Sequence, residues 1–459
     1  MINRVLAAVV GLAASLTVLT DGAGSAAAQG RDVPLIRDAE IEATIRAYAD
    51  PLFTAAGLDA AAIKVHLLQG DRINAVVAPG ENMFINTGLL MRADRPNQVI
   101  GVIAHETGHI AGRHLVRIQD ELHNATVEAI AAMLLGVGAG IASGNGDIGV
   151  GAVALGQSIA QRNLLKYSRT QEASADQAGM GFLDDTHQSA RGLLEFFEKL
   201  EGEEYLLGDN QDPYVQTHPL TRDRIDSVAQ HVEHSPYSDA KDTPELIEKH
   251  QRMLAKLRGF LWPLDRVLLT YPLSDTSVPA RYARSIAYFR VSRLKEALAQ
   301  IDSLIQEQSN DAFFLEQKGQ FLFQNGRLAD ALPLYQQAAD LKPREALIRQ
   351  ELGWVQLETE QPEYVKPAVG NLEFASRMEA NDPTTWQLLA VAYGRDGQLG
   401  MSALAQAEQA MASGRKKEAR LQARRALKGL PTGSMGWLRS NVIGLAAGGP
   451  NDENQDGMP

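Results

Sequence analysis

The sequence predicts an α+β domain, mostly helical with a small sheet, followed by an all-α solenoid of paired helices. Residues 82–86 alternate with the period of two that is typical of a strand. The apolar run over residues 99–104 follows Asp94 and Pro96, which are typical of a helix start. Farther along, small and aromatic residues recur at an interval of about 34 residues, which is typical of stacked helix pairs.

Composition excludes several classes of protein. A chain of 459 residues suggests two to four domains at roughly 100–200 residues each. Its 45% apolar and 22% charged residues are ordinary for globular domains, and its net charge of -12 argues against nucleic acid as a partner. The absence of cysteine excludes disulfides, thiolate nucleophiles and Cys-ligated zinc, so any metal must use His, Asp or Glu.

The N-terminus predicts export. Residues 1–4 carry one positive charge, residues 5–19 are apolar, and residues 26–28 are three alanines. This is the layout of a cleavable signal peptide over residues 1–28, and it predicts a mature chain, from Gln29, in the periplasm. An uncleaved membrane anchor is the alternative, but the apolar run is short for a spanning helix.

The mature chain divides into four predicted parts. They are the domain with the candidate chemistry at 29–235, a helical linker at 236–280, helical repeats at 281–430, and a C-terminal extension at 431–459 whose end we expect to be disordered.

The repeats show their period residue by residue. Gly319 and Gly353 are separated by about 34 residues, and so are Ala297 and Ala331. This spacing predicts tetratricopeptide-like units, each a helix–turn–helix, with extra residues in the third unit around 361–366. An irregular helical bundle is the alternative. Stacked units of this kind bind protein partners along a concave face.

A metal site is indicated by residues 105–109, which read His-Glu-Thr-Gly-His. Residues four apart on a helix share a face, so His105 and His109 can hold one ion. Glu106 is then placed to act as a general base on a water. Glu172 and Asp176 are again four residues apart. Glu172 can be the third ligand, and Asp176 can accept the free N–H of a metal-bound imidazole. The alternative for these two carboxylates is a solvated helix face.

Other histidines fit the pattern less well. His114 lies one residue short of the position that a third histidine takes in the metzincin pattern, so we do not expect it to bind the metal. We expect surface positions for the histidines with no supporting spacing: His123, His187, His231, His234 and His250.

Three segments together carry a family resemblance. They are residues 103–109, residues 172–176, and residues 217–224, which read Thr-His-Pro-Leu-Thr-Arg-Asp-Arg. The chain resembles the bacterial BepA-like metalloproteases, of the wider family of HtpX and the CAAX prenyl protease. Residues 73–90 are also similar to that family's strand and turn.

The resemblance implies a zincin-like fold over about residues 40–230, with a tetratricopeptide domain after it. It implies one zinc ion per chain, held by His105, His109 and Glu172, with Glu106 as the base. It also implies a periplasmic zinc endopeptidase that degrades misfolded or misassembled outer-membrane proteins.

The partners expected on this reading are unfolded or misassembled polypeptides, the outer-membrane assembly machinery through the repeats, and no nucleic acid. A second hypothesis is a chaperone or assembly scaffold with a latent or structural zinc. Glu106 favours the enzyme, because a structural zinc needs no base. An aminopeptidase is a third hypothesis, but no acidic subsite for a free amino terminus accompanies the strand.

Two segments suggest contacts. An exposed strand edge at residues 82–86 would hold extended substrate by β-addition; the alternative is a core strand. Residues 127–160 form two apolar runs around a Gly-rich break. They predict a helical hairpin that lies on a membrane surface, covers the active cleft or is buried in the core.

His218 precedes Pro219, which biases it toward an extended loop. As a fourth zinc ligand it would lock the enzyme in a latent state, and swung aside it would donate a hydrogen bond to the oxyanion. A surface bystander is the third possibility, and we favour the lock. Arg224 is expected to tie this loop to an acidic partner that the sequence does not identify.

Overall fold

The computed structural model describes residues 35–78, 80–114, 169–207 and 213–448. The segments predicted to be a signal peptide, an apolar hairpin (127–160) and a disordered end lie outside these residues. Within them, no helix combines the length and the apolar character that crossing a membrane requires.

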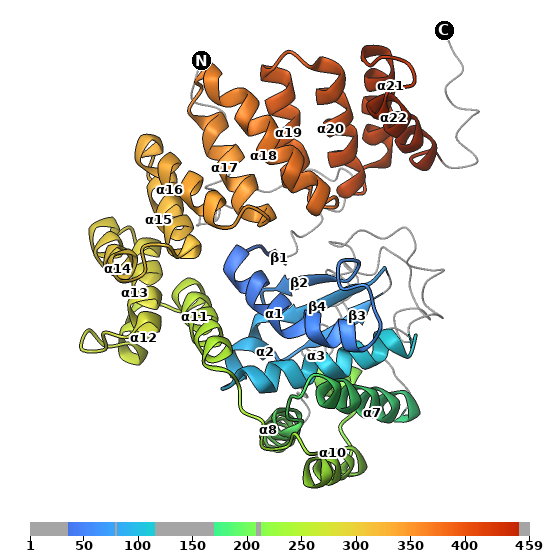
Figure 1. Ribbon diagram of the computed structural model, residues 1–459, viewed down its shortest axis with the longest axis vertical. Helices are drawn as coiled ribbons and strands as arrows, with labels where there is room; N and C mark the ends of the chain where they lie inside the picture. Colours follow the sequence, from blue (N-terminus) through green and yellow to red (C-terminus); the bar gives the residue numbers. More distant parts are fainter. Residues whose placement is uncertain (1–34, 79, 115–168, 208–212, 449–459) are drawn as a thin grey trace, which may run out of the picture. The chain divides into compact units, whose positions relative to one another are not determined.

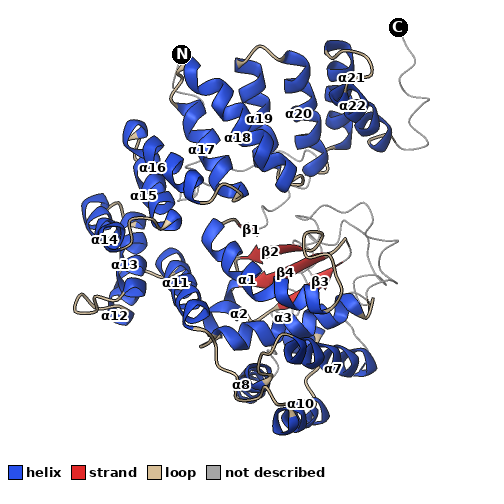
Figure 2. Cartoon of the chain, in the orientation of Figure 1, coloured by secondary structure: helices blue, strands red, loops and turns tan. Residues whose placement is uncertain are grey.

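A four-stranded sheet lies in the first part of the chain (Figure 2). Its order is β1(Leu35–Ile36), β2(Lys64–Leu68), β4(Asn82–Asn86) and β3(Ala75–Ala78). β2 runs parallel to β4, while β1 and β3 pair antiparallel with their neighbours. β4 is buried along its length between β2 and β3, so the expectation of an exposed edge at residues 82–86 is wrong. Among the described strands, β3 is the edge on that side.

Seven helices accompany this sheet in the described residues up to 234. They are α1(Ala39–Ala55), α2(Thr87–Arg92), α3(Pro96–Ala111), α7(Arg169–Asp185), α8(Arg191–Leu207), α9(Pro213–Thr217) and α10(Arg222–His234). α3 has its proline in the first turn and is buried from Pro96 to His109, packed against β3, α1, α7 and α8. The helix predicted for the His-Glu-x-x-His segment is therefore confirmed, and it is the central helix of this domain.

The expected linker helix is α11(Pro244–Leu261), and it does more than connect. It packs on α1, α2 and α3 and also on α13. Met253 and Leu257 belong to the core around the sheet, while Ala255 belongs to the core of the first repeat. His250 is 1% exposed, with Nε2 3.0 Å from the carbonyl oxygen of Ala93, so its expected surface position is wrong.

After α12(Leu264–Thr270), the described residues form five helix pairs (Figure 1). The pairs are α13(Val278–Arg290) with α14(Leu294–Glu307), α15(Ala312–Gln324) with α16(Leu328–Leu341), α17(Ala346–Glu358) with α18(Val365–Met378), α19(Pro383–Arg395) with α20(Leu399–Ala412), and α21(Lys416–Gly429) with α22(Met435–Ala446). The first helix of each pair begins at a nearly constant interval along the chain, except for a longer interval between α17 and α19. That interval contains the short helix η5(Pro362–Tyr364), where the sequence predicts extra residues.

The fifth pair crosses the boundary expected at residue 431. α22 lies inside the predicted C-terminal extension, yet it packs on α21 and α20 as the second helix of a unit. The alanines of α20 and α21 fill this contact together with Ile443 and Ala447 of α22. The repeat region therefore extends at least to Ala446.

A buried group of charges joins α1 and α11 to the second helix pair. The Arg252 guanidinium lies 2.6 Å from Glu40 through Nε and 2.6 Å from Asp311 through Nη1. Lys256 Nζ lies 2.8 Å from Asp38 and 3.6 Å from Glu316. The two cations are 8% and 1% exposed, so these pairs are shielded from water and salt.

We predict that Arg252→Ala lowers the free energy of unfolding by about 3–5 kcal/mol, because it leaves the largely buried Asp311 carboxylate without its cation and removes one of the two cations beside Glu40. Chemical denaturation monitored by circular dichroism measures it. Arg293→Ala is the matched control, since Arg293 pairs with Glu296 at the surface, and its cost should stay below ~1 kcal/mol. Equal losses for the two variants would contradict the prediction.

Candidate metal centre

Helix α3 presents the first two candidate ligands and the candidate base. His105, Glu106 and His109 are all 0% exposed. The Nε2 atoms of His105 and His109 lie 3.1 Å apart, as the spacing of four residues requires. Two imidazole nitrogens facing each other at this distance can share one proton or one cation.

Helix α7 brings the candidate third ligand against α3. The two helices meet at two glycines. A Cβ on Gly108 would lie 2.5 Å from the carbonyl oxygen of Ala175, and one on Gly179 would lie 2.9 Å from the backbone of Ala104. Only glycine permits this approach. It places the Glu172 carboxylate 3.4 Å from His109 Nε2 and 3.5 Å from His105 Nε2.

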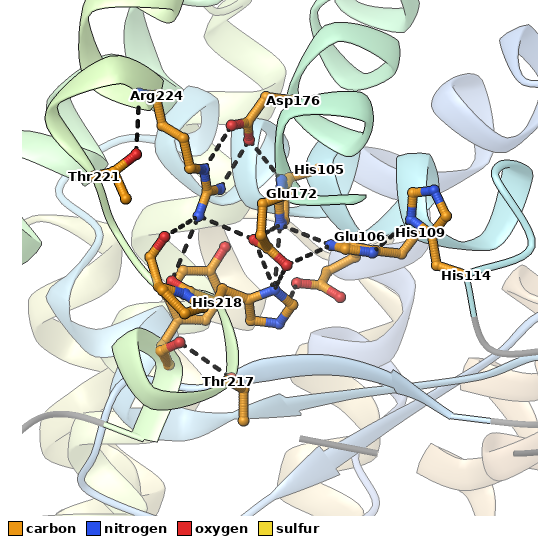
Figure 3. A network of polar contacts seen from close by, with 12 residues as sticks. His105, Glu106, His109, His114, Glu172, Asp176, Thr217, His218, Thr221 and Arg224 are labelled. Atoms are coloured by element: carbon orange, nitrogen blue, oxygen red, sulfur yellow. Dashed lines mark hydrogen bonds and ion pairs between the residues drawn. The ribbon is translucent and has the colours of Figure 1, made fainter. Parts of the chain in front are cut away.

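His218 completes the group (Figure 3). It lies in the bend after α9, before Pro219, as the sequence predicts. Its Nδ1 atom is 3.3 Å from both Glu172 oxygens and 3.4 Å from His105 Nε2. On the other side of the ring, Nε2 lies 3.5 Å from Glu106. The structure therefore brings together residues that the sequence singles out in three separate segments.

The donor set fits a divalent transition metal. One atom from each of His105, His109, Glu172 and His218 lies within 4.8 Å of the others, and all four side chains are buried. Three imidazole nitrogens and a carboxylate oxygen are the ligands that zinc takes in the absence of cysteine. A cation at this point would also neutralise Glu172 and separate the imidazole nitrogens.

Asp176 orients one of these ligands. Its Oδ1 atom lies 2.7 Å from His105 Nδ1, which leaves Nε2 of the same ring for the metal. Burial alone would lower the pKa of His105, but the Asp176 and Glu172 carboxylates together outweigh burial and raise that pKa to about 9. Asp176 is thus on the inside of α7, and the alternative of a solvated face does not apply to it or to Glu172.

Arg224 neutralises the two buried carboxylates of α7, Glu172 and Asp176. Its Nη1 atom lies 2.9 Å from Glu172, and its Nε and Nη2 atoms lie 2.7 and 2.9 Å from the two oxygens of Asp176. Thr221 caps α10 by accepting the Arg224 backbone N–H, which fixes where this side chain begins. Burial would raise the pKa of Asp176, yet Arg224 and His105 hold it below its usual range. These are the acidic partners that the sequence leaves unidentified.

Glu106 is suited to a base. Burial raises its pKa from the ordinary value of a glutamate, so that it accepts a proton more readily near neutral pH. Neither of its carboxylate oxygens has a well-aligned hydrogen-bonding partner among the described residues. A water within the group would meet this acceptor first, because Glu106 neighbours His105 in the chain and both point into the same group (Figure 3).

His114 is not one of the four residues of the candidate ligand group. It has another contact that sequence reasoning missed: its Nδ1 lies 2.9 Å from His109 Nδ1. Tyr214 was also missed, and its ring lies 4.8 Å from that of His218. The signal for His114 was its position five residues after His109, where the end of α3 turns it back.

These features define a class of protein before any relative is considered. The site contains two histidines and a glutamate around one point, with a further buried carboxylate beside them, on a helix with the pattern His-Glu-x-x-His. This combination is that of a metalloprotease. Residues 36–232 match the model of Peptidase family M48, and residues 285–404 match that of a tetratricopeptide repeat. The chain thus combines a metalloprotease domain that is similar to peptidase family M48 with tetratricopeptide repeats after it.

Three relatives have the same type of name. The putative beta-barrel assembly-enhancing protease of Vibrio cholerae is 26% identical over 54% of this chain and 52% of that protein. The beta-barrel assembly-enhancing proteases of Yersinia pestis and Escherichia coli K12 are 23% and 22% identical, over 84% and 78% of this chain. The matched regions cover 79% and 73% of those two proteins, but only about half of the Vibrio protein.

We predict that Asp176→Asn weakens metal binding by about 10–100-fold, because it removes the carboxylate that orients His105 and half of the charge that faces Arg224. Competition with a chromogenic chelator measures the affinity. Asp184→Asn, on the same helix but paired with His231, is the control and should bind as the parent does. Unchanged affinity in Asp176→Asn would refute the orienting role.

Proposed function

We propose that the chain is a zinc-dependent endopeptidase with one zinc ion, held by His105, His109 and Glu172. The observation that carries the proposal is the buried convergence of these three side chains beside Glu106. Zinc is favoured over harder cations because two imidazoles outnumber the carboxylate in the set, and over copper(I) because the site offers no thiolate or thioether.

The residues divide the chemistry among them. When bound, zinc would polarise the scissile carbonyl and lower the pKa of a water to about 7. Glu106 accepts the proton of the attacking water and delivers it to the leaving amine. Asp176 holds the His105 ring, and Arg224 holds Asp176 and Glu172. These two are positioning residues, since they reach the reacting atoms only through other side chains.

His218 has two proposed positions. In the structure it lies within the ligand group, where it would complete four protein ligands and close the site to water. This position supports the lock over the surface bystander, because His218 is 1% exposed. With the loop moved outward, the same imidazole could donate a hydrogen bond to the oxyanion.

The proposed substrates are unfolded or misassembled polypeptides, and the proposed compartment is the periplasm. The predicted leader over residues 1–28 supports export, and the relatives named beta-barrel assembly-enhancing protease support a role in the quality control of outer-membrane proteins. The repeats support binding of a protein partner, for which we propose the outer-membrane assembly machinery.

A scaffold or chaperone with a latent zinc is the second candidate. It is favoured by the same observation that supports the lock, namely the fourth buried side chain in the ligand group. The two functions differ in Glu106, whose buried carboxylate a structural site would not need.

We predict that Glu106→Gln keeps one zinc per chain but lowers casein cleavage by at least about 100-fold, because it removes the base and no ligand. Metal analysis by mass spectrometry and a fluorescent casein assay measure the two effects. His105→Ala, His109→Ala and Glu172→Ala should lose most of the metal. Cleavage at the parental rate by Glu106→Gln would eliminate the enzyme as proposed.

We predict that His218→Ala raises casein cleavage by about tenfold, because a site with three protein ligands stays open to water. The steady-state rate at equal zinc content measures it. His231→Ala, which changes a histidine of α10 that pairs with Asp184, is the control. A lower rate would assign His218 to the oxyanion, and an unchanged rate would make it a bystander; either result contradicts the lock.

A further inference from the structure

The last described helix leaves an apolar face uncovered. Met435, Leu438, Val442 and Leu445 of α22 are 83, 46, 52 and 72% exposed. Their spacing of three, four and three residues puts them on one stripe along the helix. The opposite side of α22, with Ser440 and Ile443, is buried.

This stripe is unusual for its place. The outer face of a terminal unit in a helical solenoid is normally polar, and α22 belongs to the last unit that the structure describes. On α22 that face consists of four large apolar side chains, flanked by exposed Asn441 and by Arg439, which pairs with Glu408. Single exposed apolar residues are ordinary, but a continuous stripe indicates a binding surface.

The helix that packs against α22 is strongly basic. Six of the 14 residues of α21 are Lys or Arg and one is acidic, whereas the whole chain has a net charge of -12. Its alanines face α20 and α22 and are buried. Lys417, Arg425 and Lys428 are exposed on the other side. One end of the repeats therefore combines an apolar stripe with a charge opposite to that of the rest of the protein.

We propose that this basic end, defined as α21 and α22, docks on the surface of an anionic phospholipid bilayer. The apolar stripe would enter the boundary between headgroups and acyl chains, and the cations of α21 would meet the lipid phosphates. Trp437, half-buried on α22, belongs to the residue type that favours this boundary.

Charge favours an anionic bilayer over a second copy of the chain or a protein partner as the occupant of the stripe. A second copy of the chain, paired stripe to stripe, would cover the apolar side chains but leave the cations of α21 without an anionic partner. A protein partner would need a groove shaped to one helix, whereas a bilayer needs only the apolar stripe and the cations. The acidic remainder of the chain is repelled by anionic lipid, so contact through the basic end is the orientation that electrostatics favours.

The test uses the chain from Gln29 onward, without the apolar leader, in flotation with vesicles. Vesicles of phosphatidylcholine with phosphatidylglycerol are compared with vesicles of phosphatidylcholine alone. We expect binding to the anionic vesicles only, weakening as salt is raised. Lys417→Glu/Arg425→Glu/Lys428→Glu and Leu438→Asp/Val442→Asp should each lower the partition coefficient by at least about tenfold.

Two control variants carry equal changes elsewhere. Lys295→Glu/Arg344→Glu/Lys366→Glu reverses three exposed cations of other repeats, and Leu269→Asp/Leu273→Asp changes two exposed leucines of the α12 region. Both should bind as the parent does. All variants should keep the parental helix content and casein cleavage rate, which separates this proposal from the proposed enzyme.

Several results would overturn docking on a bilayer. They are equal binding to neutral and anionic vesicles, no binding to either, and binding that the basic-end variants retain. A dimer in light scattering that Leu438→Asp/Val442→Asp dissociates would assign the stripe to a second copy. The triple charge reversal changes only exposed side chains, so it keeps the test decisive if the apolar variant fails to fold.

Discussion

The metalloprotease domain depends on one constraint. Two carboxylates are buried beside a helix that is itself buried from Pro96 to His109. An unpaired carboxylate in such a place costs several kcal/mol. Arg224 offsets that cost for Glu172 and Asp176 together, through a planar guanidinium with donors to both. The same cation ties α10 to α7, because it reaches both carboxylates from the first turn of α10.

The same guanidinium also holds the loop that carries His218. Arg224 Nη1 donates to the carbonyl oxygen of Pro219 at 3.0 Å as well as lying 2.9 Å from Glu172. An outward movement of His218 would therefore break a bond to Pro219 while the pair of Arg224 with Asp176 stays in place. Ligand geometry and loop position are linked through one side chain, but the loop can be released without dismantling the buried ion pairs.

The sequence predicted the parts of the site that local periodicity controls. His105, Glu106 and His109 follow from one helical turn, and so does the pairing of Glu172 with Asp176. It did not predict what brings α7 to α3, because the contact depends on Gly108 and Gly179 meeting backbone from a distant part of the chain. Register in the sheet was missed for the same reason: alternation in residues 82–86 indicates a strand but does not say whether it lies at an edge.

In the repeats, too, the sequence predicted what local periodicity controls and missed what depends on distant contacts. The period of about 34 residues predicted the helix pairs and the extra residues near 361–366, since each unit repeats a local pattern. The second helix of the fifth pair was missed, although α22 has small residues at Gly436, Ser440, Gly444 and Ala446 and packs on the alanines of α21. Its membership in the solenoid depends on packing across units, which a period within one unit does not encode.

Buried and exposed cations of this chain have different surroundings, and the difference bears on function. Arg224 and the pair Arg252 and Lys256 are buried among carboxylates that they neutralise, so they fix neighbouring elements. On α21, six cations accompany one acidic residue, and exposed Lys417, Arg425 and Lys428 are screened chiefly by solvent ions. Releasing those ions favours any polyanion that approaches. Six cations and one acidic residue on one helix, beside an apolar stripe that the described repeats leave uncovered, are therefore better explained by an external surface than by folding.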